Sequence, residues 1–186
     1  MKRLLDCVLA GLLCAMLAPL LALVILVITL TSSGSSIYWS NRIGQNNRIF
    51  KMPKFRTMHS DTPAVATHLL IDAHLYLTPI GSFLRKTSLD ELPQLWSVIK
   101  GDMSLVGPRP ALFNQHDLIE VRSAMGIHAL RPGITGWAQI NGRDDLAIFD
   151  KVALDAEYLH RQSFGFDCYI LWLTALRVLR RDGVSH

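Results

Sequence analysis

The longest hydrophobic run of the chain covers residues 7–30 and contains no charged side chain. As one continuous helix it would reach about 36 Å, enough to cross the hydrocarbon core of a bilayer. A cleaved signal peptide fits this pattern less well, because its apolar region is normally about 7–15 residues long and no convincing cleavage site follows here. The pattern therefore predicts an N-terminal helix that enters the membrane.

Two features of this run bear on its topology. Pro19 lies near its centre, where a proline removes a backbone donor and bends a helix. Both flanks are basic, with Lys2 and Arg3 before the run and Arg42 to Arg56 after it, and basic flanks favour the cytoplasmic side. A helix hairpin broken at Pro19 would keep both flanks on one side, whereas a bitopic anchor with a tolerated proline would not. The residues alone do not decide between these two topologies.

Shorter patterns after this run predict a second unit of mixed secondary structure. Residues 1–36 form the predicted membrane helix and its polar linker, and residues 37–186 form the second predicted domain. Within that domain, residues 49–52 are typical of a strand or a short buried run. Helices are predicted at 147–161 and 167–181, the second of which could pack in the core or lie on the membrane.

A further helical pattern follows two adjacent acids, Asp90 and Glu91. Its apolar side chains recur at i, i+3, i+4 and i+7, at Leu92, Leu95, Trp96 and Ile99. We expect this helix to begin near Asp90, with Asp90 as N-cap or with Ser88 and Glu91 as a capping box, and to end at Gly101. For a lone helix, capping is the simplest interpretation of the acids, because carboxylates favour helix N-termini.

Composition narrows the functional classes. Half of the residues are hydrophobic and the net charge is +4, which fits an anionic membrane surface or a phosphorylated substrate. Zinc-ligand spacing, a basic helix and a glycine–aromatic signature are all missing from the sequence, so nucleic acid is not an expected partner. The three cysteines suggest no disulfide framework and indicate a reducing compartment.

The cations around the two acids change their interpretation. Arg85 and Lys86 precede the acids, and Arg109 follows between two prolines that stiffen its backbone. Arginine can bind phosphate through two parallel hydrogen bonds, and an acid among such cations can hold Mg²⁺ or attack phosphorus. Asp90 and Glu91 are therefore candidate catalytic residues, and Arg85 and Arg109 are candidate phosphate ligands.

Two more cations, Lys54 and Arg56, lie on either side of Phe55. An extended strand would present both cations on one face. On local sequence alone, a solvated or lipid-facing basic strip is the simpler interpretation, and phosphate binding is the alternative.

Taken in order, these segments resemble the bacterial sugar transferase family, the monotopic phosphoglycosyl transferases. Each motif is weak alone, but the ordered set is highly specific and covers nearly the whole chain. The matching segments are Lys2-Arg3-x-x-Asp6, Pro19, Arg42-x-Gly44, 54–58 (KFRTM), 84–94 (LRKTSLDELPQ), 100–110 (KGDMSLVGPRP) and 132–136 (PGITG).

The resemblance implies an α/β, mostly helical, membrane-associated fold with a small sheet, amphipathic interfacial helices and a re-entrant membrane helix hairpin broken near Pro19. It implies a catalytic domain on the cytoplasmic face of the bacterial inner membrane, in contact with membrane lipid. The implied reaction moves a sugar 1-phosphate from a UDP-sugar to a polyprenol phosphate such as undecaprenyl phosphate, and releases UMP. Such a reaction is the first membrane step in assembling O-antigen, capsule, exopolysaccharide or glycoprotein glycans.

The same resemblance assigns roles to the candidate residues. Asp90 would attack the β-phosphorus and form a covalent phosphosugar intermediate, which polyprenol phosphate then displaces. Mg²⁺ is the implied cofactor, held against Asp90 and the diphosphate, while Glu91 positions groups or assists the metal. The expected substrate-binding residues are Lys54, Arg56, Arg85 and Arg109 for phosphate, and Asp155, which matches a late family acid.

Some positions depart from the family pattern, but none of them is part of the acidic dyad formed by Asp90 and Glu91. Ser40 stands where glutamine is usual, Ser97 where asparagine is common, and Glu157 where tyrosine is frequent. The chain resembles the short form, without a further transmembrane bundle ahead of the hairpin, and this form resembles enzymes that use N-acetylated amino sugars. The sequence does not reveal the sugar, the polyprenol length or the oligomeric state, a homodimer being one option.

Two other functions remain open on the sequence. A membrane-anchored, metal-dependent nucleotide-sugar hydrolase would use the same acids and cations, with water as acceptor. A non-catalytic adaptor would bind anionic lipid through its basic strip and use Asp90 only as a helix cap.

Overall fold

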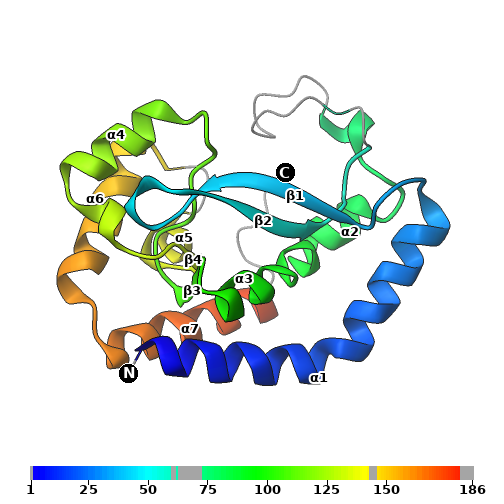
Figure 1. Cartoon of the computed structure of the whole chain (residues 1–186), viewed down its shortest axis with the longest axis horizontal. Helices are drawn as coiled ribbons and strands as arrows, with labels where there is room; N and C mark the ends of the chain where they lie inside the picture. The colour runs from blue at the N-terminus through cyan, green and yellow to red at the C-terminus, as the bar shows by residue number, and fades with distance from the viewer. Residues whose placement is uncertain (1, 60–61, 63–72, 143–145, 181–186) are drawn as a thin grey trace.

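The computed structural model describes the chain except for residues 1, 60–61, 63–72, 143–145 and 181–186. The described part is mostly helical, with a long strand hairpin across the centre and a smaller strand pair beside it (Figure 1). The helices are α1 (Lys2–Thr31), α2 (Gly81–Lys86), α3 (Gln94–Lys100), α4 (His116–Ala124), α5 (Trp137–Asn141), α6 (Ile148–Arg161) and α7 (Phe164–Arg180). The strands are β1 (Ile37–Ile43), β2 (Ile49–Phe55), β3 (Ser104–Val106) and β4 (Gly133–Thr135). Short 3₁₀ turns lie at η1 (Gln45–Asn47), η3 (Ala73–Tyr76), η4 (Leu89–Glu91) and η5 (Ile127–Ala129).

The two strand pairs differ in direction. β1 and β2 are antiparallel, with Ile37 opposite Phe55, whereas β3 and β4 are parallel, with Ser104 opposite Gly133. The predicted strand at 49–52 is confirmed as part of β2. The two predicted C-terminal helices are present as α6 and α7. The structure therefore agrees with the expected mostly helical fold with a small sheet.

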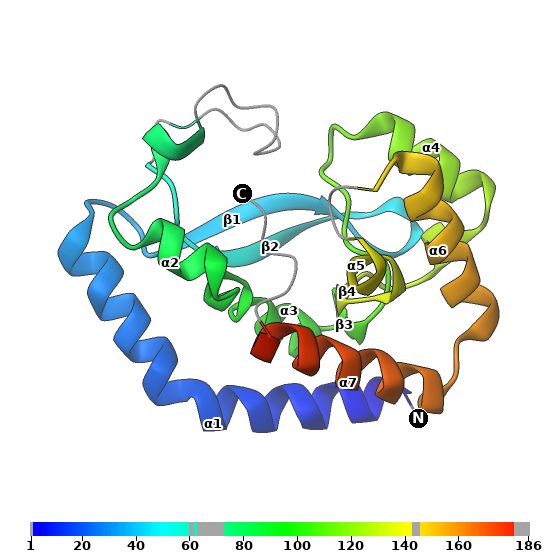
Figure 2. The same cartoon turned by 180° about the vertical axis from the view of Figure 1, so that it is seen from behind.

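α1 is the one helix in the described part that is long and apolar enough to cross a membrane. Of its most apolar 18-residue stretch, 11% is buried against the rest of the protein, so α1 is not the core helix of a soluble fold. Pro19 lies inside the helix, and α1 bends midway into two diverging legs (Figures 1 and 2). The missing N–H of proline weakens the helix locally and accounts for the bend. The two legs do not pack side by side as a closed hairpin.

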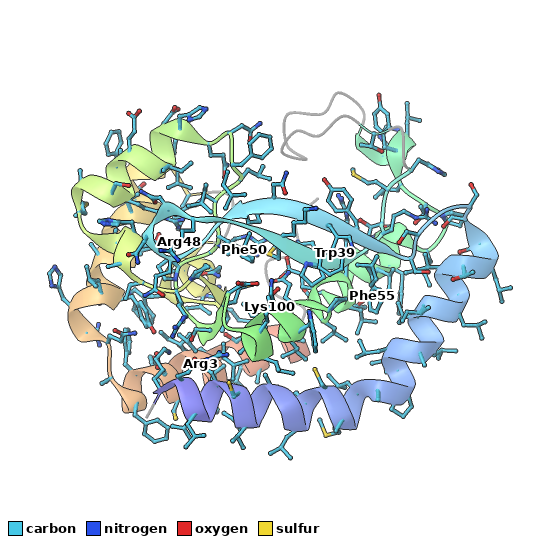
Figure 3. All side chains as sticks on the ribbon, viewed as in Figure 1. Arg3, Trp39, Arg48, Phe50, Phe55 and Lys100 are labelled. Atoms are coloured by element: carbon cyan, nitrogen blue, oxygen red, sulfur yellow. The ribbon has the colours of Figure 1, made fainter. Side chains whose placement is uncertain are left out.

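The N-terminal leg of α1 is fastened to the rest of the molecule by its three charged side chains. Arg3 reaches from the first turn of α1 toward α3, where its guanidinium donates to the Val98 carbonyl and, at 2.8 Å, to the Ile99 carbonyl (Figure 3). The buried Asp6 carboxylate accepts a hydrogen bond of 2.8 Å from the Ser104 hydroxyl of β3. Lys2 forms an ion pair of 2.5 Å with Asp167 of α7. Cations at the C-terminal end of α3 also favour its helix dipole.

The same leg contributes to the main hydrophobic core. Ala10 is fully buried there, and Leu13 and Leu17 pack against the cluster. The buried members of this core are Ala10, Met52, Leu95, Val98, Met103, Leu105, Val106, Ile140, Tyr158, Phe166 and Ile170. The segment predicted as a separate membrane unit therefore shares a core with the second predicted domain.

The C-terminal leg of α1 packs against a second, smaller cluster. Val24 and Ile28 are buried there together with Phe55 of β2 and Leu84 of α2. Beyond the helix end, the guanidinium of Arg56 donates to main-chain carbonyls of the following turn, the contacts being Ser32 at 2.9 Å and Ser33 at 2.5 Å. Both ends of α1 are thus held by the same folded domain.

Candidate active site

The acidic dyad lies in the 3₁₀ turn η4, between α2 and α3. Ser88, the residue before this turn, has a left-handed backbone with φ 55°, which redirects the chain out of α2. α3 begins at Gln94, because Pro93 cannot donate a backbone hydrogen bond to the preceding turn. The expectation that the helix begins near Asp90 is therefore wrong. Gly101 ends α3 as predicted, with φ 105°.

Neither form of the predicted helix cap is present. Ser88 makes no side-chain capping bond to η4, and the N-cap position of α3 is taken by Pro93. The Asp90 carboxylate accepts no hydrogen bond from the residues that the structure describes. The two acids thus have no structural role as caps, which removes the main argument for the simple structural interpretation.

Glu91 is held by two cations from different parts of the chain. A single carboxylate oxygen, Oε1, accepts from Lys54 Nζ of β2 at 2.7 Å and from Arg109 Nη2 at 3.0 Å. Burial by itself would raise the pKa of Glu91, but Arg109 and Lys54 together hold this pKa well below its usual range. Glu91 is therefore a fixed anion that keeps Lys54 and Arg109 beside its neighbour in the dyad.

Asp90 has a different environment. Its side chain is buried, and this burial raises the pKa of Asp90 above its usual value, although Lys54, Arg85 and Arg109 oppose the increase and Glu91 adds to it. A desolvated carboxylate whose oxygens are not engaged by hydrogen-bond donors is well suited to nucleophilic attack. The two neighbouring acids thus differ in environment, which is a frequent sign of divided catalytic roles.

Arg85 is the third cation at the dyad. It lies in the last turn of α2, and its Nε donates to the Thr57 hydroxyl at 3.0 Å. Burial lowers the pKa of Arg85, and the negative charge of Asp90 opposes this decrease. Lys54, Arg85 and Arg109 therefore surround the dyad with positive charge, as a site for phosphate groups requires.

The arginine loop at 108–111 is held by its main chain. Each of its four consecutive carbonyl oxygens accepts a hydrogen bond from a different residue. The donors are, in order, the Gly133 N–H at 2.9 Å, Arg122 Nη1 at 2.8 Å, Arg42 Nη1 at 3.1 Å and the Ile43 N–H at 2.9 Å. A loop fixed in this way presents the Arg109 side chain from a defined backbone position.

The glycine-rich motif explains how β4 comes so close to this loop. A Cβ atom on Gly133 would lie 2.1 Å from the Gly107 nitrogen, and one on Gly136 would lie 2.1 Å from the Gly107 oxygen. Real Cβ contacts are never this short, so a larger residue would push β4 away from the loop. Gly133 and Gly136 thus allow the backbone of this turn region to pack directly against Gly107, next to the arginine loop.

Two of the predicted substrate-binding residues lie outside this cluster. Arg56 is bonded to the turn after α1, and the described contacts give no support for a phosphate contact. Asp155 is 1% exposed and binds the guanidinium of Arg122, with contacts of 3.0 Å to Nε and 2.5 Å to Nη2. Burial raises the pKa of Asp155, and Arg122 opposes that increase. Asp155 therefore contacts Arg122 and not the dyad. Arg122 in turn donates to the carbonyl of Arg109 in the arginine loop.

Sequence reasoning missed Arg122 as a functional residue. It is one of several polar positions in α4, and it lies 33 residues from Asp155 in the chain. A local motif could not have revealed the pair. Arg42 was noted as part of a motif, but its contact with the Pro110 carbonyl was not predicted.

The acids at the dyad could supply only part of the coordination of a Mg²⁺ ion. Among the described residues, no group of three or more histidine, cysteine or acidic side chains could hold a metal. Magnesium commonly binds through one or two carboxylates and completes its coordination with water and substrate phosphates. Asp90, whose carboxylate accepts no hydrogen bond from the described residues, and the second carboxylate oxygen of Glu91 are the groups that would hold such an ion.

Comparisons with known proteins place this chain in a family. The model of the bacterial sugar transferase family matches residues 1–181. The uncharacterized sugar transferase EpsL of Bacillus subtilis is 39% identical over 185 residues, which cover all of this chain and 90% of that protein. The undecaprenyl-phosphate glucose phosphotransferase of Komagataeibacter xylinus is 42% identical over 95% of this chain, and the UDP-glucose:undecaprenyl-phosphate glucose-1-phosphate transferase of Escherichia coli is 39% identical over 95%. This chain spans 35% and 40%, respectively, of the length of those two relatives.

Proposed function

Because this chain belongs to the bacterial sugar transferase family, we propose that it transfers a sugar 1-phosphate from a UDP-sugar to undecaprenyl phosphate and releases UMP. The observation that carries this proposal is the pair of acids in η4. One acid, Glu91, is a fixed anion between Lys54 and Arg109, and the other, Asp90, is buried and accepts no hydrogen bond from the described part of the chain. Relatives whose names specify undecaprenyl-phosphate glucose transfer support the reaction class.

In this reaction a carboxylate oxygen of Asp90 forms a bond to the β-phosphorus of the UDP-sugar. The bond between that phosphorus and the oxygen bridging the two phosphates breaks, and UMP leaves with the electron pair. A phosphate oxygen of the polyprenol phosphate then attacks the same phosphorus and releases the Asp90 carboxylate. Dividing the transfer into two displacements lets a soluble donor and a lipid acceptor use one site in turn.

The surrounding cations stabilise the charge that develops during both displacements. Arg109 and Arg85 are suited to bind the non-bridging phosphate oxygens, and Lys54 adds a point charge beside the nucleophile. Glu91 keeps Lys54 and Arg109 in position through the contacts at its Oε1. Mg²⁺ held by Asp90 and Glu91 would neutralise the diphosphate as UMP leaves.

The identity of the sugar is a separate part of the proposal. The names of the relatives include glucose and galactosyl transferases, whereas the resemblance to the short form of the family favours an N-acetylated amino sugar. We keep the amino sugar as the proposed donor and include both hexoses as competitors. The product, a sugar linked to polyprenol through a diphosphate, would serve as the starting unit for the assembly of a polysaccharide or another glycoconjugate.

The experiment that tests the function measures UMP release by the purified full-length protein in lipid nanodiscs. The donors tested are UDP-glucose, UDP-galactose and UDP-linked N-acetylated amino sugars, and we expect UMP release from one of them. Release over multiple turnovers should require undecaprenyl phosphate. UMP release that continues without the lipid acceptor would instead identify a hydrolase. Absence of release with every donor would refute the transferase assignment.

The membrane helix is proposed to be re-entrant, with both ends on the cytoplasmic face of the inner membrane. Support comes from the two anchoring sites, because Arg3 and Asp6 tie one end of α1 to the domain and Arg56 ties the other. A helix whose ends are held on one side cannot place them on opposite sides of a bilayer. The bend at Pro19 and the exposed apolar side chains of α1 allow shallow insertion instead.

This topology predicts the position of the N-terminus. Fusion of green fluorescent protein to the N-terminus should give fluorescent cells, and fusion of alkaline phosphatase at the same place should give no phosphatase activity. The C-terminal fusions serve as the cytoplasmic control. Phosphatase activity from the N-terminal fusion would show that α1 spans the bilayer.

The pKa of Asp90 predicts an acid limb in the pH dependence of kcat/KM. The nucleophile must be ionised, so kcat/KM should decrease as the pH is lowered and Asp90 becomes protonated. Because the pKa of Asp90 lies above its usual value, this decrease should begin at a higher pH than for an ordinary aspartate. Lys54 is the strongest of the cations that lower this pKa, so Lys54→Met should move the acid limb to higher pH. Lys51→Met, an exposed lysine on the same strand, is the matched control and should not move it. An unchanged limb in Lys54→Met would contradict the assignment of Asp90 as the titrating group.

A further inference from the structure

Arg122 of α4 connects the arginine loop to Asp155, a buried acid whose side-chain contacts are with Arg122 and not with Asp90 or Glu91. It is 8% exposed, and three of its nitrogens donate hydrogen bonds to other residues. Nε and Nη2 donate to one oxygen of Asp155 on α6, and Nη1 donates at 2.8 Å to the carbonyl oxygen of Arg109. One guanidinium therefore joins α4, α6 and the arginine loop.

The contact with Arg109 concerns its backbone, and this matters for its side chain. At the other end of the same residue, the Arg109 side chain places Nη2 3.0 Å from Glu91 Oε1. A small displacement of the residue's carbonyl group moves the origin of that side chain. Misplacement of a substrate-binding group by about 1 Å can reduce an enzymatic rate by about a hundredfold.

The simultaneous contacts with the Asp155 carboxylate and the Arg109 carbonyl suit the guanidinium of arginine and no other side chain. A guanidinium is planar, keeps its charge and can donate in two directions at once, whereas the ammonium of lysine is a single point. Asp155 orients the guanidinium so that Nη1 points to the Arg109 carbonyl. The other loop carbonyls accept from Gly133, Arg42 and Ile43, and the carbonyl of Arg109 accepts from Arg122.

We propose that Arg122, oriented by Asp155, is a positioning residue of the transfer reaction that sets the place of Arg109 at the phosphate site. This inference rests on the proposed function, since it assigns Arg109 to the reacting phosphates. It also gives Asp155 an indirect role, in place of direct substrate binding.

The first test compares Arg122→Lys and Asp155→Asn with the wild type by steady-state UMP release. Both variants keep the approximate size of the side chain, so at least one is expected to fold. We expect kcat to fall by about 10- to 100-fold, with a smaller change in the KM for the UDP-sugar, because the misplaced group acts mainly in the transition state. Arg161→Lys is the matched control, since Arg161 pairs with Glu157 on α6 and does not contact the loop. That control should keep the wild-type kcat.

A double-mutant cycle with Arg109 separates positioning from general stability. In an Arg109→Met background, Arg122→Lys should change kcat by less than about threefold, because the group that it positions is gone. Hydrogen exchange provides a readout independent of activity. Arg122→Lys should increase deuterium uptake in the segment 107–112 and leave uptake in α7 unchanged.

Each outcome decides the inference. A local increase in loop exchange together with non-additive kinetics would support it. Wild-type kcat in both Arg122→Lys and Asp155→Asn would overturn it and leave the proposed function intact, and so would additive effects with faster exchange throughout the protein. Absence of UMP release by the wild type would instead overturn the proposed function, and the inference with it.

Discussion

The Asp90→Asn variant is expected to lose transfer activity by about a thousandfold or more and to form no covalent adduct. An amide cannot displace UMP from the β-phosphorus, while the cations that bind the phosphates remain in place. Intact-protein mass spectrometry after incubation with the UDP-sugar, without lipid acceptor, should show a sugar-phosphate adduct on the wild type. Peptide mapping should place that adduct on Asp90.

The folded state of this variant provides its own control. Because burial raises the pKa of Asp90, the ionised carboxylate is less favourable in the folded protein than in the unfolded chain at neutral pH. Removing that charge should therefore leave the melting temperature unchanged or increase it. Loss of activity with a folded, equally stable protein would separate the chemistry from the fold. Retained turnover, or an adduct mapped to Glu91, would refute Asp90 as the nucleophile.

The Arg109→Met variant is expected to reduce kcat/KM by about 10²- to 10³-fold, as for the loss of one preorganised donor to a transition-state oxyanion. The substitution removes the guanidinium and leaves a side chain of comparable length. It also removes one of the two cations that hold the carboxylate of Glu91. Steady-state UMP release at varied UDP-sugar concentration measures the effect.

Two comparison variants make this result specific to phosphate recognition. Arg109→Lys keeps the charge but loses the planar fork, so we expect activity between that of the wild type and that of Arg109→Met. Arg48→Met, at an exposed position near the hairpin turn, should behave as the wild type. Activity of Arg109→Met within about threefold of the wild type would show that the loop arginine does not act on the substrate.

The dyad illustrates how local sequence and tertiary structure contribute differently. Local patterns alone favoured a helix cap, because carboxylates are common at helix starts. The structure shows that Pro93 separates the dyad from α3, so Asp90 and Glu91 lie in a 3₁₀ turn without a capping role. The neighbouring cations had indicated chemistry at this position, and ion pairs of Glu91 with Lys54 and Arg109 agree with that interpretation.

Cations separated in sequence show the limits of this reasoning. Lys54 and Arg56 are two residues apart on an extended chain, and both were expected to bind phosphate. The structure pairs Lys54 with Glu91, whereas Arg56 lies after the strand and binds the turn that follows α1. Spacing predicted a shared face, but the end of β2 at Phe55 removed the alternation on which that prediction depended.

By itself, the sequence determined the membrane helix, the order of the main elements and the identity of the two acids, because these depend on hydrophobic periodicity and on short motifs. The tertiary structure alone decided which cations meet the dyad, that Asp155 forms an ion pair with Arg122, and that both ends of α1 are held by one domain. The physical reason is the distance along the chain between partners. Hydrogen bonds such as Arg122 to Asp155, or Asp6 to Ser104, join residues 33 and 98 positions apart. No local pattern encodes such a contact, because it forms only when separate elements pack on a common core.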